Sequence, residues 1–201
     1  MKKYIFINKI FLFLFMIMMS SCEGIFILDP IDPRLPKYTE KGNDVAGALV
    51  NDKVWKSIVE YGFLTSSDKP HIIASQSNDS LVIRFEGDVL GSVTTMEFHL
   101  TGLHIKAFAD LILLKDKKVQ LDGTRNAGFM RDNSDISYST KGGAGQIYFR
   151  HVEVNNVSGV AILSGTFGFS FVDNFSAINE VAYGRFDYKF GKNDEFLVEY
   201  D

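Results

Sequence analysis

The amino-acid sequence predicts an all-β fold, an antiparallel β-sandwich or, as the alternative, a β-barrel. Three observations lead to this fold class. Several segments alternate between apolar and polar residues with a period of two, which is typical of half-buried strands. Turn signals rich in Asn, Asp and Gly separate these segments at short intervals. The 18 phenylalanines among the 201 residues supply the bulk that fills a core between two sheet faces.

The first 21 residues have the pattern of a secretory signal peptide. Three lysines form a positively charged start, residues 10–19 form an apolar run, and Ser20-Ser21 precede the lone cysteine, Cys22. The end of this pattern resembles the lipobox of bacterial lipoproteins, with Met19 where leucine is usual. We therefore expect cleavage before Cys22, acylation of Cys22 with fatty acids such as palmitate, and stable membrane attachment through several acyl chains.

Two alternatives to a lipid anchor are an uncleaved transmembrane segment and an ordinary secretory signal. The apolar run is shorter than the roughly 20 residues that a spanning helix needs, and Asn8 and Lys9 separate it from the residues before it. An unmodified Cys22 would be exported to an oxidising compartment without an internal partner. Both observations favour the lipid anchor.

Behind the signal, the sequence divides into a tether and one domain. Residues 22–44 are predicted to be the lipidated cysteine and a semi-extended tether, because they hold three of the four prolines. Residues 45–201 suit a single β-sandwich domain with a sizeable core. The formal charge of the chain is −4, and the loss of three lysines with residues 1–21 makes it −7. An acidic chain with dispersed cations argues against nucleic acid as a partner.

Four segments of the domain show the alternation most clearly: Leu81–Glu86, Met96–Leu100, Phe167–Phe171 and Arg185–Phe190. In the last segment one face is charged and the other aromatic, so Arg185 and Asp187 are predicted to form a solvent-facing pair. Residues 103–118 differ from the rest, because their alanines and leucines fit a short helix as readily as a strand.

Seven turn signals divide the domain and predict many hairpins. They are Asn51-Asp52, Ser77–Asp79, Asp122-Gly123, Asp132-Asn133, Lys141–Gly143, Asn155-Asn156 and Asp173-Asn174. The glycine-rich stretch Thr140–Gly145 lacks the strand-to-helix context and the GK[ST] order of a phosphate-binding loop, so it is predicted to be a flexible hairpin end.

Two parts of the domain carry a resemblance. Gly47–Trp55 combines a glycine, a strand pattern, an Asn-Asp-Lys turn and a tryptophan behind a proline-containing tether, and three closing segments follow: Gly145–Val154, Leu163–Phe169 and Gly184–Tyr188. These stretches resemble a family of uncharacterised Gram-negative lipoproteins, from which the chain departs at Asp52, where that family commonly has glycine, and through residues 103–118. The resemblance implies a β-sandwich on a lipid tether, residence at the outer membrane, and no established activity.

Two conspicuous residues and two acidic loops have structural interpretations. We predict that Trp55 anchors the core and that Gly165 is a strand-crossing or bulge glycine. The acidic loops Asp132–Asp135 and Asp122–Asn126 do not match a calcium-binding loop, and we interpret both as turns in which Asp and Asn bind their own backbone.

The sequence offers no catalytic or metal-binding constellation. The four histidines, His71, His99, His104 and His151, show no metal-ligand spacing, and Ser164 lacks the surroundings of a nucleophile elbow. Cys22 is therefore the one residue with an assigned role, and we expect neither enzymatic activity nor a cofactor.

These observations predict a cell-envelope lipoprotein of unknown molecular activity, acting as a non-enzymatic binding or accessory module for an envelope protein or a glycan. The alternatives are a carrier of a small glycan or lipid and, less favoured, a hydrolase. A filled core favours the first function, an apolar cavity of several hundred cubic ångströms the second, and converging acids or histidines with shifted pKa values the third. The membrane face and the oligomeric state stay open.

Overall fold

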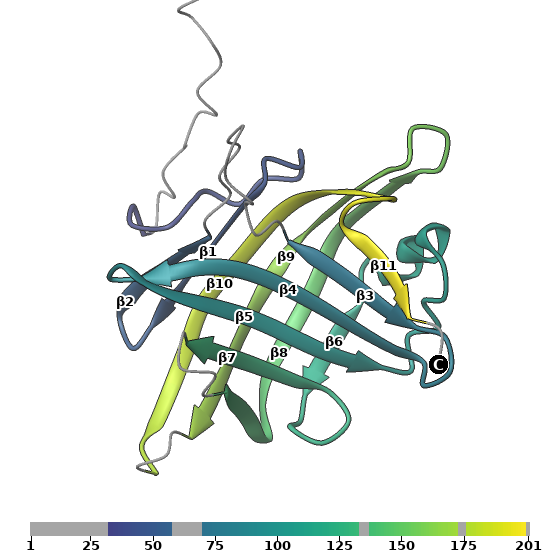
Figure 1. Ribbon diagram of the computed structural model, residues 1–201. Coiled ribbons are helices and arrows are strands. Elements are labelled where there is room, and N and C mark those ends of the chain that lie inside the picture. Colours follow the sequence, from purple (N-terminus) through teal and green to yellow (C-terminus); the bar gives the residue numbers. More distant parts are fainter. Residues whose placement is uncertain (1–31, 58–69, 133–136, 173–175, 200–201) are drawn as a thin grey trace, which may run out of the picture.

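The computed structural model describes residues 32–57, 70–132, 137–172 and 176–199. Its strands belong to one strongly curled sheet (Figure 1), which confirms the all-β prediction. Cys22, residues 1–21 and the turn signal Asp173-Asn174 lie outside the described residues.

The described residues form eleven strands and one short helix. In chain order these are β1 (Val45–Val50), β2 (Lys53–Ser57), β3 (His71–Ser75), β4 (Ser80–Val89), β5 (Ser92–Thr101), η1 (Phe108–Leu114), β6 (Lys118–Leu121), β7 (Ala127–Asp132), β8 (Ser137–Asn155), β9 (Val160–Val172), β10 (Ile178–Gly191) and β11 (Phe196–Glu199).

The pairing of the strands explains why the sheet curls. Their order is β11-β3-β4-β2-β1-β10-β9-β8-β7-β5, and β6 pairs with β8. Strand β5 pairs with β7 and also with β4, so the two distant parts of this order are brought together. Strands β11 and β3 are parallel to each other, and the other pairs are antiparallel.

Tight turns connect neighbouring strands where the sequence predicts them. Asn51 and Asp52 have φ of 47° and 64°, the left-handed conformation that a two-residue hairpin turn requires and that Asn and Asp tolerate best. Leu90 and Gly91, with φ of 55° and 82°, make the equivalent turn between β4 and β5. The turn signals at Ser77–Asp79, Asp122-Gly123 and Asn155-Asn156 also lie between strands.

The prediction that the glycine-rich stretch is a flexible hairpin end is wrong. Thr140–Gly145 is not a hairpin end but part of β8, where the register against β9 shifts between Thr140 and Gly145. Glycine tolerates the irregular backbone of a bulge, so this stretch interrupts the ladder without ending the strand.

The concave side of the sheet holds the core. The predicted inward residues of β4, β5, β9 and β10 are buried: Leu81, Ile83, Phe85, Met96, Phe98, Leu100, Phe167, Phe169, Phe171, Phe186, Tyr188 and Phe190. Trp55 is 0% exposed, and its indole N–H donates to the carbonyl oxygen of Thr94 at 2.8 Å. The prediction that Trp55 anchors the core is therefore confirmed.

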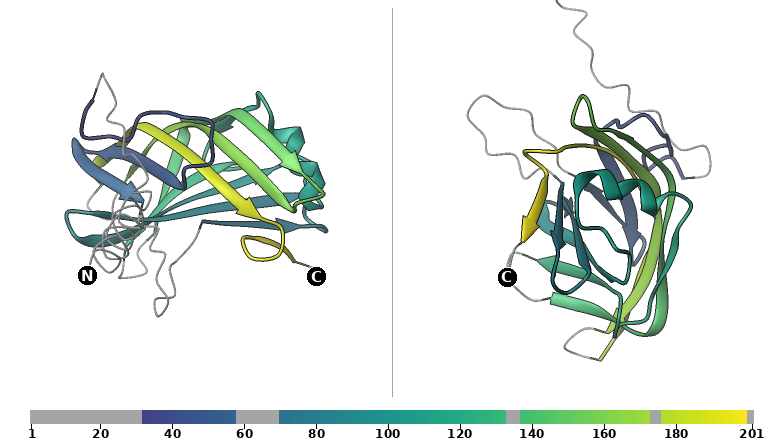
Figure 2. Two further views of the ribbon diagram at one scale, coloured as in Figure 1. Left: turned by 90° about the horizontal axis from the view of Figure 1, so that it is seen from above. Right: turned by 90° about the vertical axis from the view of Figure 1, so that its right-hand side faces the viewer.

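Residues 103–118, for which the sequence fits helix and strand equally, contain a helix. Residues Phe108–Leu114 form the 3-10 helix η1, which buries Phe108, Leu111 and Leu114. The carboxylate of Asp110 accepts hydrogen bonds from the backbone N–H groups of Lys106 and Ala107 at 3.0 and 2.8 Å and so fixes the first turn. The right view of Figure 2 shows η1 across one open end of the curled sheet.

The described part of the predicted tether lies against the domain. In residues 32–44, which we call the strap, Leu35, Pro36 and Gly42 are buried. A Cβ added at Gly47 of β1 would lie only 2.5 Å from Pro36 Cδ, so the strap packs closely against the sheet.

Candidate functional site

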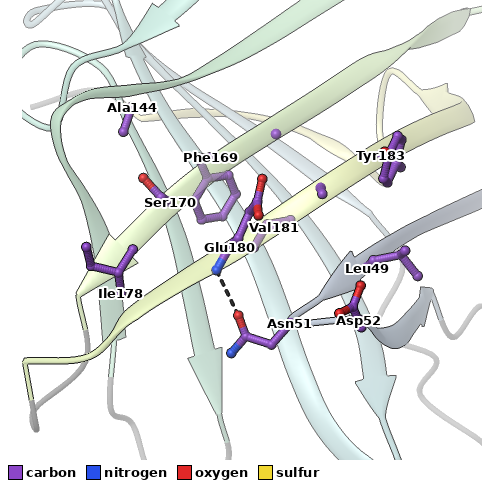
Figure 3. Close-up of a pocket in the computed structure, with 12 residues that line it drawn as sticks. Leu49, Asn51, Asp52, Ala144, Phe169, Ser170, Ile178, Glu180, Val181 and Tyr183 are labelled. Carbon is purple, nitrogen blue, oxygen red and sulfur yellow. Dashed lines mark hydrogen bonds between the residues drawn. The ribbon is translucent and has the colours of Figure 1, made fainter.

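The convex side of β8, β9 and β10 carries a groove with two hollows. The acidic hollow, of about 860 Å³, lies beside the β1–β2 turn and contains Asp52 and Glu180 (Figure 3). The basic hollow, of about 490 Å³, contains Arg150 and Arg185. Both hollows are lined by Gly168 and Tyr183, so they adjoin each other.

A bulge in β10 shapes the floor of the groove. The register of β10 against β9 shifts between Val181 and Gly184, and Tyr183 in this bulge has a φ of 53° with 66% of its surface exposed. A bulky residue in the left-handed region is strained, and such strain concentrates at functional sites. Tyr183 is therefore the first residue to test for a role in binding.

Gly168 leaves the floor of the basic hollow without a side chain. It lines the hollow, and an added Cβ there would approach the Val181 carbonyl oxygen to 3.2 Å. Gly184 also lines the hollow, but its missing side chain makes room on the core side, where an added Cβ would lie 2.4 Å from Cδ2 of the buried Phe167.

The strap forms one wall of the basic hollow through Tyr38. The Arg150 guanidinium lies over the Tyr38 ring, 4.8 Å from its centroid, which is a cation–π geometry. The Tyr38 hydroxyl donates to Glu40 Oε1 at 2.9 Å. Burial, the hydrogen bond to Glu40 and the charge of Glu40 all raise the pKa of Tyr38, so its hydroxyl stays protonated.

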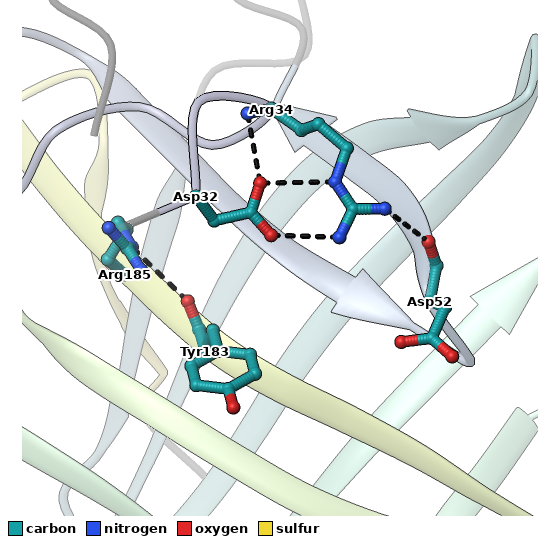
Figure 4. A network of polar contacts seen from close by, with 5 residues as sticks. All are labelled: Asp32, Arg34, Asp52, Tyr183 and Arg185. Carbon is teal, nitrogen blue, oxygen red and sulfur yellow. Dashed lines mark hydrogen bonds and ion pairs between the residues drawn. The ribbon is translucent and has the colours of Figure 1, made fainter. Parts of the chain in front are cut away.

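Backbone carbonyls orient the second arginine. Arg185 donates from Nε to the carbonyl oxygen of Tyr183 at 3.2 Å (Figure 4). Its Nη1 donates to the carbonyl oxygen of Pro36 at 3.4 Å. These bonds tie the guanidinium to both the bulge and the strap, and its charge also lowers the pKa of Asp32.

The acidic hollow is built on polar contacts around the β1–β2 turn. Glu180 N–H donates to Asn51 Oδ1 at 2.9 Å, and Arg34 on the strap donates to the carbonyl oxygen of Asp52 at 3.0 Å. Arg34 also forms an ion pair with Asp32 at 2.8 Å (Figure 4). The hydrogen bonds from Arg34 hold the pKa of the exposed Asp32 carboxyl below its ordinary value.

Asp187 locks the strap onto the sheet. Its carboxylate accepts hydrogen bonds from five groups, the hydroxyls of Thr39 and Ser164 and the backbone N–H groups of Lys41, Gly42 and Asn43. Burial raises the pKa of Asp187, but the hydrogen bonds from Thr39, Ser164 and Gly42 outweigh it and leave the pKa below its ordinary value. The carboxylate is therefore charged at neutral pH.

This arrangement corrects the predicted solvent-facing pair of Arg185 and Asp187. Asp187 lies on the convex side, as the alternation indicates, but it is only 2% exposed because the strap covers it. Arg185 reaches the strap at Pro36 instead.

A second charged cluster lies on the convex side of β4, β5 and β7. Glu97, 1% exposed, pairs with Arg84 at 2.9 Å, with Arg131 at 3.0 Å and with His99. Burial acts to raise the pKa of Glu97, but the hydrogen bond from His99 and the charges of Arg84, His99 and Arg131 lower it to about 2. A carboxylate held ionised by two arginines and a hydrogen bond from a histidine is a structural ion pair rather than a general acid.

The histidines are not brought together. His99, His104 and His151 each lie near a different carboxylate, those of Glu97, Asp79 and Glu40. Within the described ranges, no group of three or more His, Cys, Asp or Glu residues is arranged to hold a metal ion.

The loop Asp122–Asn126 is a turn, as predicted. Asp122 Oδ1 accepts hydrogen bonds from the backbone N–H groups of Thr124, Arg125 and Asn126 at 2.8 to 3.1 Å, and these bonds lower the pKa of Asp122 to about 2. The loop Asp132–Asp135 lies largely outside the described residues. Gly165 faces a register shift of β8 between Phe149 and His151, which confirms it as a glycine opposite a bulge.

The sequence prediction missed the groove. Its one detectable signal is the spacing in β10, where Val181 and Phe186 both point inward although they are five positions apart, an odd number. Side chains on one face of a regular strand are an even number of positions apart, so an odd spacing requires one extra residue. The bulge that contains the strained Tyr183 supplies it.

Comparison of the chain with family models, curated proteins and solved structures finds no match. Among the described residues, no helix combines the length and apolar character needed to cross a membrane.

Proposed function

We propose that this protein is a cell-envelope lipoprotein, anchored at the outer membrane by acylated Cys22, whose domain is a non-enzymatic binding or accessory module. The residues that bind its partner are those of the convex groove. The signal pattern before Cys22 supports the anchor, and the resemblance to Gram-negative lipoproteins supports the location. An envelope protein or a glycan is the expected partner.

One observation carries this proposal: the strap, which follows Cys22 in the chain, forms a wall of the groove. Tyr38 of the strap lines the basic hollow, and Asp187 holds the strap in place. The segment that leads from the membrane anchor is thus part of the groove. A ligand bound there would contact a segment that lies close to the anchor along the chain.

The filled interior favours a binding module over a small-ligand carrier. Phe85 lies at the centre of the core, with the rings of Phe98, Phe167, Phe186 and Tyr188 4.8 to 6.5 Å away. A carrier would need these rings to line a cavity. The two hollows of the groove lie on the other side of the sheet.

We propose further that the domain is the barrel alternative rather than a two-layer sandwich. The ladder from β4 through β2, β1, β10, β9, β8, β7 and β5 returns to β4, as in a closed sheet. Strands β3 and β11 on one side and β6 on the other extend one end, where η1 lies.

The anchor is tested by expressing the full chain in a Gram-negative host with labelled palmitate. We expect the wild type and the matched control Ser21→Ala to incorporate the label and to partition into detergent, because both keep a small residue before Cys22. Cys22→Ser should do neither. Labelling and detergent partitioning of Cys22→Ser would refute the anchor.

A further inference from the structure

We propose that one end of the curled sheet, which we call the anchor end, rests on the phospholipid surface that holds Cys22, with Leu90 and Ile178 entering the headgroup layer. The anchor end carries the β1–β2 turn, the β4–β5 turn and the start of β10. This inference rests on the proposed lipid anchor and adds an interaction surface to it. The strand register, the course of the strap and the exposed apolar side chains support it.

The register of the sheet brings the three parts of the anchor end together. Val50 of β1 pairs with Val181 of β10, so the β1–β2 turn lies beside the first residues of β10. Trp55 of β2 pairs with Val89 of β4, so the β4–β5 turn lies at the same end of the sheet. Figure 1 shows the β4–β5 turn and the start of β10 along its left margin. One flat surface can therefore meet both.

Leu90 is an unusual residue for the tip of the β4–β5 turn. It is 77% exposed and has a φ of 55°. This left-handed conformation suits Asn or Asp, which the β1–β2 turn uses at Asn51 and Asp52, and is unfavourable for leucine. Neither the geometry of the turn nor burial in the core accounts for an apolar residue there. Contact with an apolar layer does.

Two more apolar side chains are exposed at the anchor end. Ile178 is 79% exposed at the first position of β10, where it pairs with Val172, the last residue of β9. Val93 is 39% exposed and follows Leu90 on the β4–β5 hairpin. Single exposed apolar residues scattered over a surface are normal, whereas a group of them marks an interaction site. These three residues form such a group around the anchor end.

Exposed apolar side chains also lie at the opposite end, which we call the far end and which carries η1 and the β8–β9 turn. They are Ile112, Leu113, Val157 and Leu197. Exposure alone therefore does not decide which end meets the lipid.

The course of the strap favours the anchor end. Arg34, near the start of the strap, donates to the carbonyl oxygen of Asp52 in the β1–β2 turn. Asp44, the last residue of the strap, accepts a hydrogen bond from the backbone N–H of Lys189, which lies toward the end of β10. The strap thus begins at the anchor end and runs toward the far end. The chain that leads to Cys22 leaves the domain at the anchor end.

The length of that chain reinforces the choice. Cys22 lies ten residues before Asp32, and a chain of ten residues spans at most about 36 Å. Strand β10 has 14 residues, which corresponds to about 46 Å of strand and, at a tilt of about 40°, to a sheet roughly 35 Å high. With the far end on the lipid, the chain to Cys22 would have to be fully extended. With the anchor end on the lipid, it would not.

The charges of the anchor end do not select an anionic surface. Asp52 and Glu180 are exposed there, and so are Lys53 and Arg34. The contact therefore depends on the apolar side chains, for which a zwitterionic phospholipid suffices. Attachment through Cys22 keeps this end at a high effective concentration near the lipid, so a few side chains are enough to hold it there.

The test uses the acylated full chain in vesicles of zwitterionic phosphatidylcholine. Because acylation consumes the sulfur of Cys22, the only native cysteine, one introduced cysteine alone takes up an environment-sensitive fluorophore. Ser92→Cys places the fluorophore beside Leu90, and Ser158→Cys, in the exposed β8–β9 turn, is the matched control. The emission of the Ser92→Cys protein should shift to shorter wavelength and be quenched by lipids with spin-labelled acyl chains. The emission of the Ser158→Cys protein should do neither.

Leu90→Asn, added to the Ser92→Cys protein, separates docking from folding. Asparagine suits the left-handed turn better than leucine, so the thermal midpoint should not fall. The ratio of quenched to unquenched protein should nevertheless fall at least about tenfold, the factor that corresponds to burial of one leucine side chain. Ile178→Asn should also lower this ratio, and Leu113→Asn, at the far end, is the control that should leave it unchanged.

Three outcomes would overturn the proposal: no shift and no quenching of the Ser92→Cys protein, equal quenching of the Ser158→Cys protein, or undiminished quenching after Leu90→Asn. Labelling of the wild type tests the anchor separately. A wild type that takes up the fluorophore has a free Cys22 thiol and loses the anchor. A wild type that stays unlabelled, together with an unquenched Ser92→Cys protein, loses only this inference.

Discussion

The carboxylate of Asp187 joins three parts of the chain. It stands on β10, receives the Ser164 hydroxyl from β9 at 2.7 Å, and receives the Gly42 N–H from the strap at 2.7 Å. Hydrogen bonds to a buried charge are stronger than those between neutral groups, and losing the acceptor leaves the donors unsatisfied. Asp187 thus holds the part of the strap around Tyr38 against the sheet, through Thr39 before it reaches Lys41, Gly42 and Asn43.

Asp187→Asn should lower the free energy of unfolding by about 2–4 kcal/mol, since each hydrogen bond to a charged group contributes roughly 1.5–3 and the losses do not add. The amide keeps the size of the carboxyl but turns an N–H₂ toward N–H donors. Urea denaturation at pH 7 measures the change. Ser164→Ala, which removes one donor and leaves the charge, is the control and should cost less.

The stability difference between the wild type and Asp187→Asn should depend on pH. The pKa of Asp187 in the folded protein lies below its ordinary value of 3.8, so its stabilisation is present above that pH and is lost as the pH falls through the folded-state pKa. The difference in unfolding free energy between the wild type and Asp187→Asn should therefore narrow below about pH 4. A difference that is constant from pH 7 to pH 3 would contradict the role of the charge.

At the residue scale, the sequence predicts which face a strand residue occupies but not what covers that face. The alternation in Arg185–Phe190 places Asp187 opposite the aromatic residues, and the structure agrees. Its burial depends on the strap, 140 residues or more away in the chain. Glu97 is buried for a comparable reason, because Arg84 and Arg131 come from the two neighbouring strands.

At the scale of elements, strand β9 depends on how closely its neighbours approach. A Cβ added at Gly165 would lie 2.1 Å from the Tyr148 carbonyl oxygen of β8 and 2.7 Å from Phe186 Cζ. The Tyr148 oxygen belongs to the backbone, so it cannot move away by a change of side-chain rotamer. The β8–β9 ladder would have to open where Arg150 occupies its bulge.

Gly165→Ala should lower the free energy of unfolding by about 2–4 kcal/mol, at or above the usual range for overpacking. Gly168→Ala, on the same strand, is the matched control. Its added Cβ would approach only the Val181 carbonyl oxygen, at 3.2 Å, so it should cost less than about 1 kcal/mol. Chemical denaturation measures the unfolding free energy of both variants. Equal losses of stability would show that the close approach at Gly165 does not cause the destabilisation.

The elements that the sequence left open or mispredicted are those in which local pattern and tertiary packing compete. Residues 103–118 fit both helix and strand, and burial of Phe108, Leu111 and Leu114 at the end of the sheet selects the helix. The glycines of Thr140–Gly145 are typical of turns, but the neighbouring strand β9 continues the ladder on both sides of them.

For the whole molecule, the curl of the sheet depends on strand pairs that periodicity does not encode. Alternation predicts that the segments in β4, β5, β9 and β10 are strands with one buried face, but it does not show which distant strands pair. The contacts that curl the sheet join Trp55 to Val89 and Met96 to Met130. The alternation therefore predicts the all-β class directly, whereas the sequence only favours a sandwich and leaves a barrel as the alternative.

Because the described strands share one hydrophobic core, a substitution at its centre should destabilise the whole fold. Phe85 is 0% exposed and contacts rings from three other strands, so Phe85→Ala should lower the free energy of unfolding by about 3–5 kcal/mol. Leu90→Ala, at the 77% exposed tip of the same hairpin, should change it by less than about 0.5 kcal/mol. Tryptophan fluorescence of Trp55 and far-ultraviolet circular dichroism should then report one shared transition for Phe85→Ala, shifted to lower urea. Two separate transitions would mean that the curled sheet folds in independent parts.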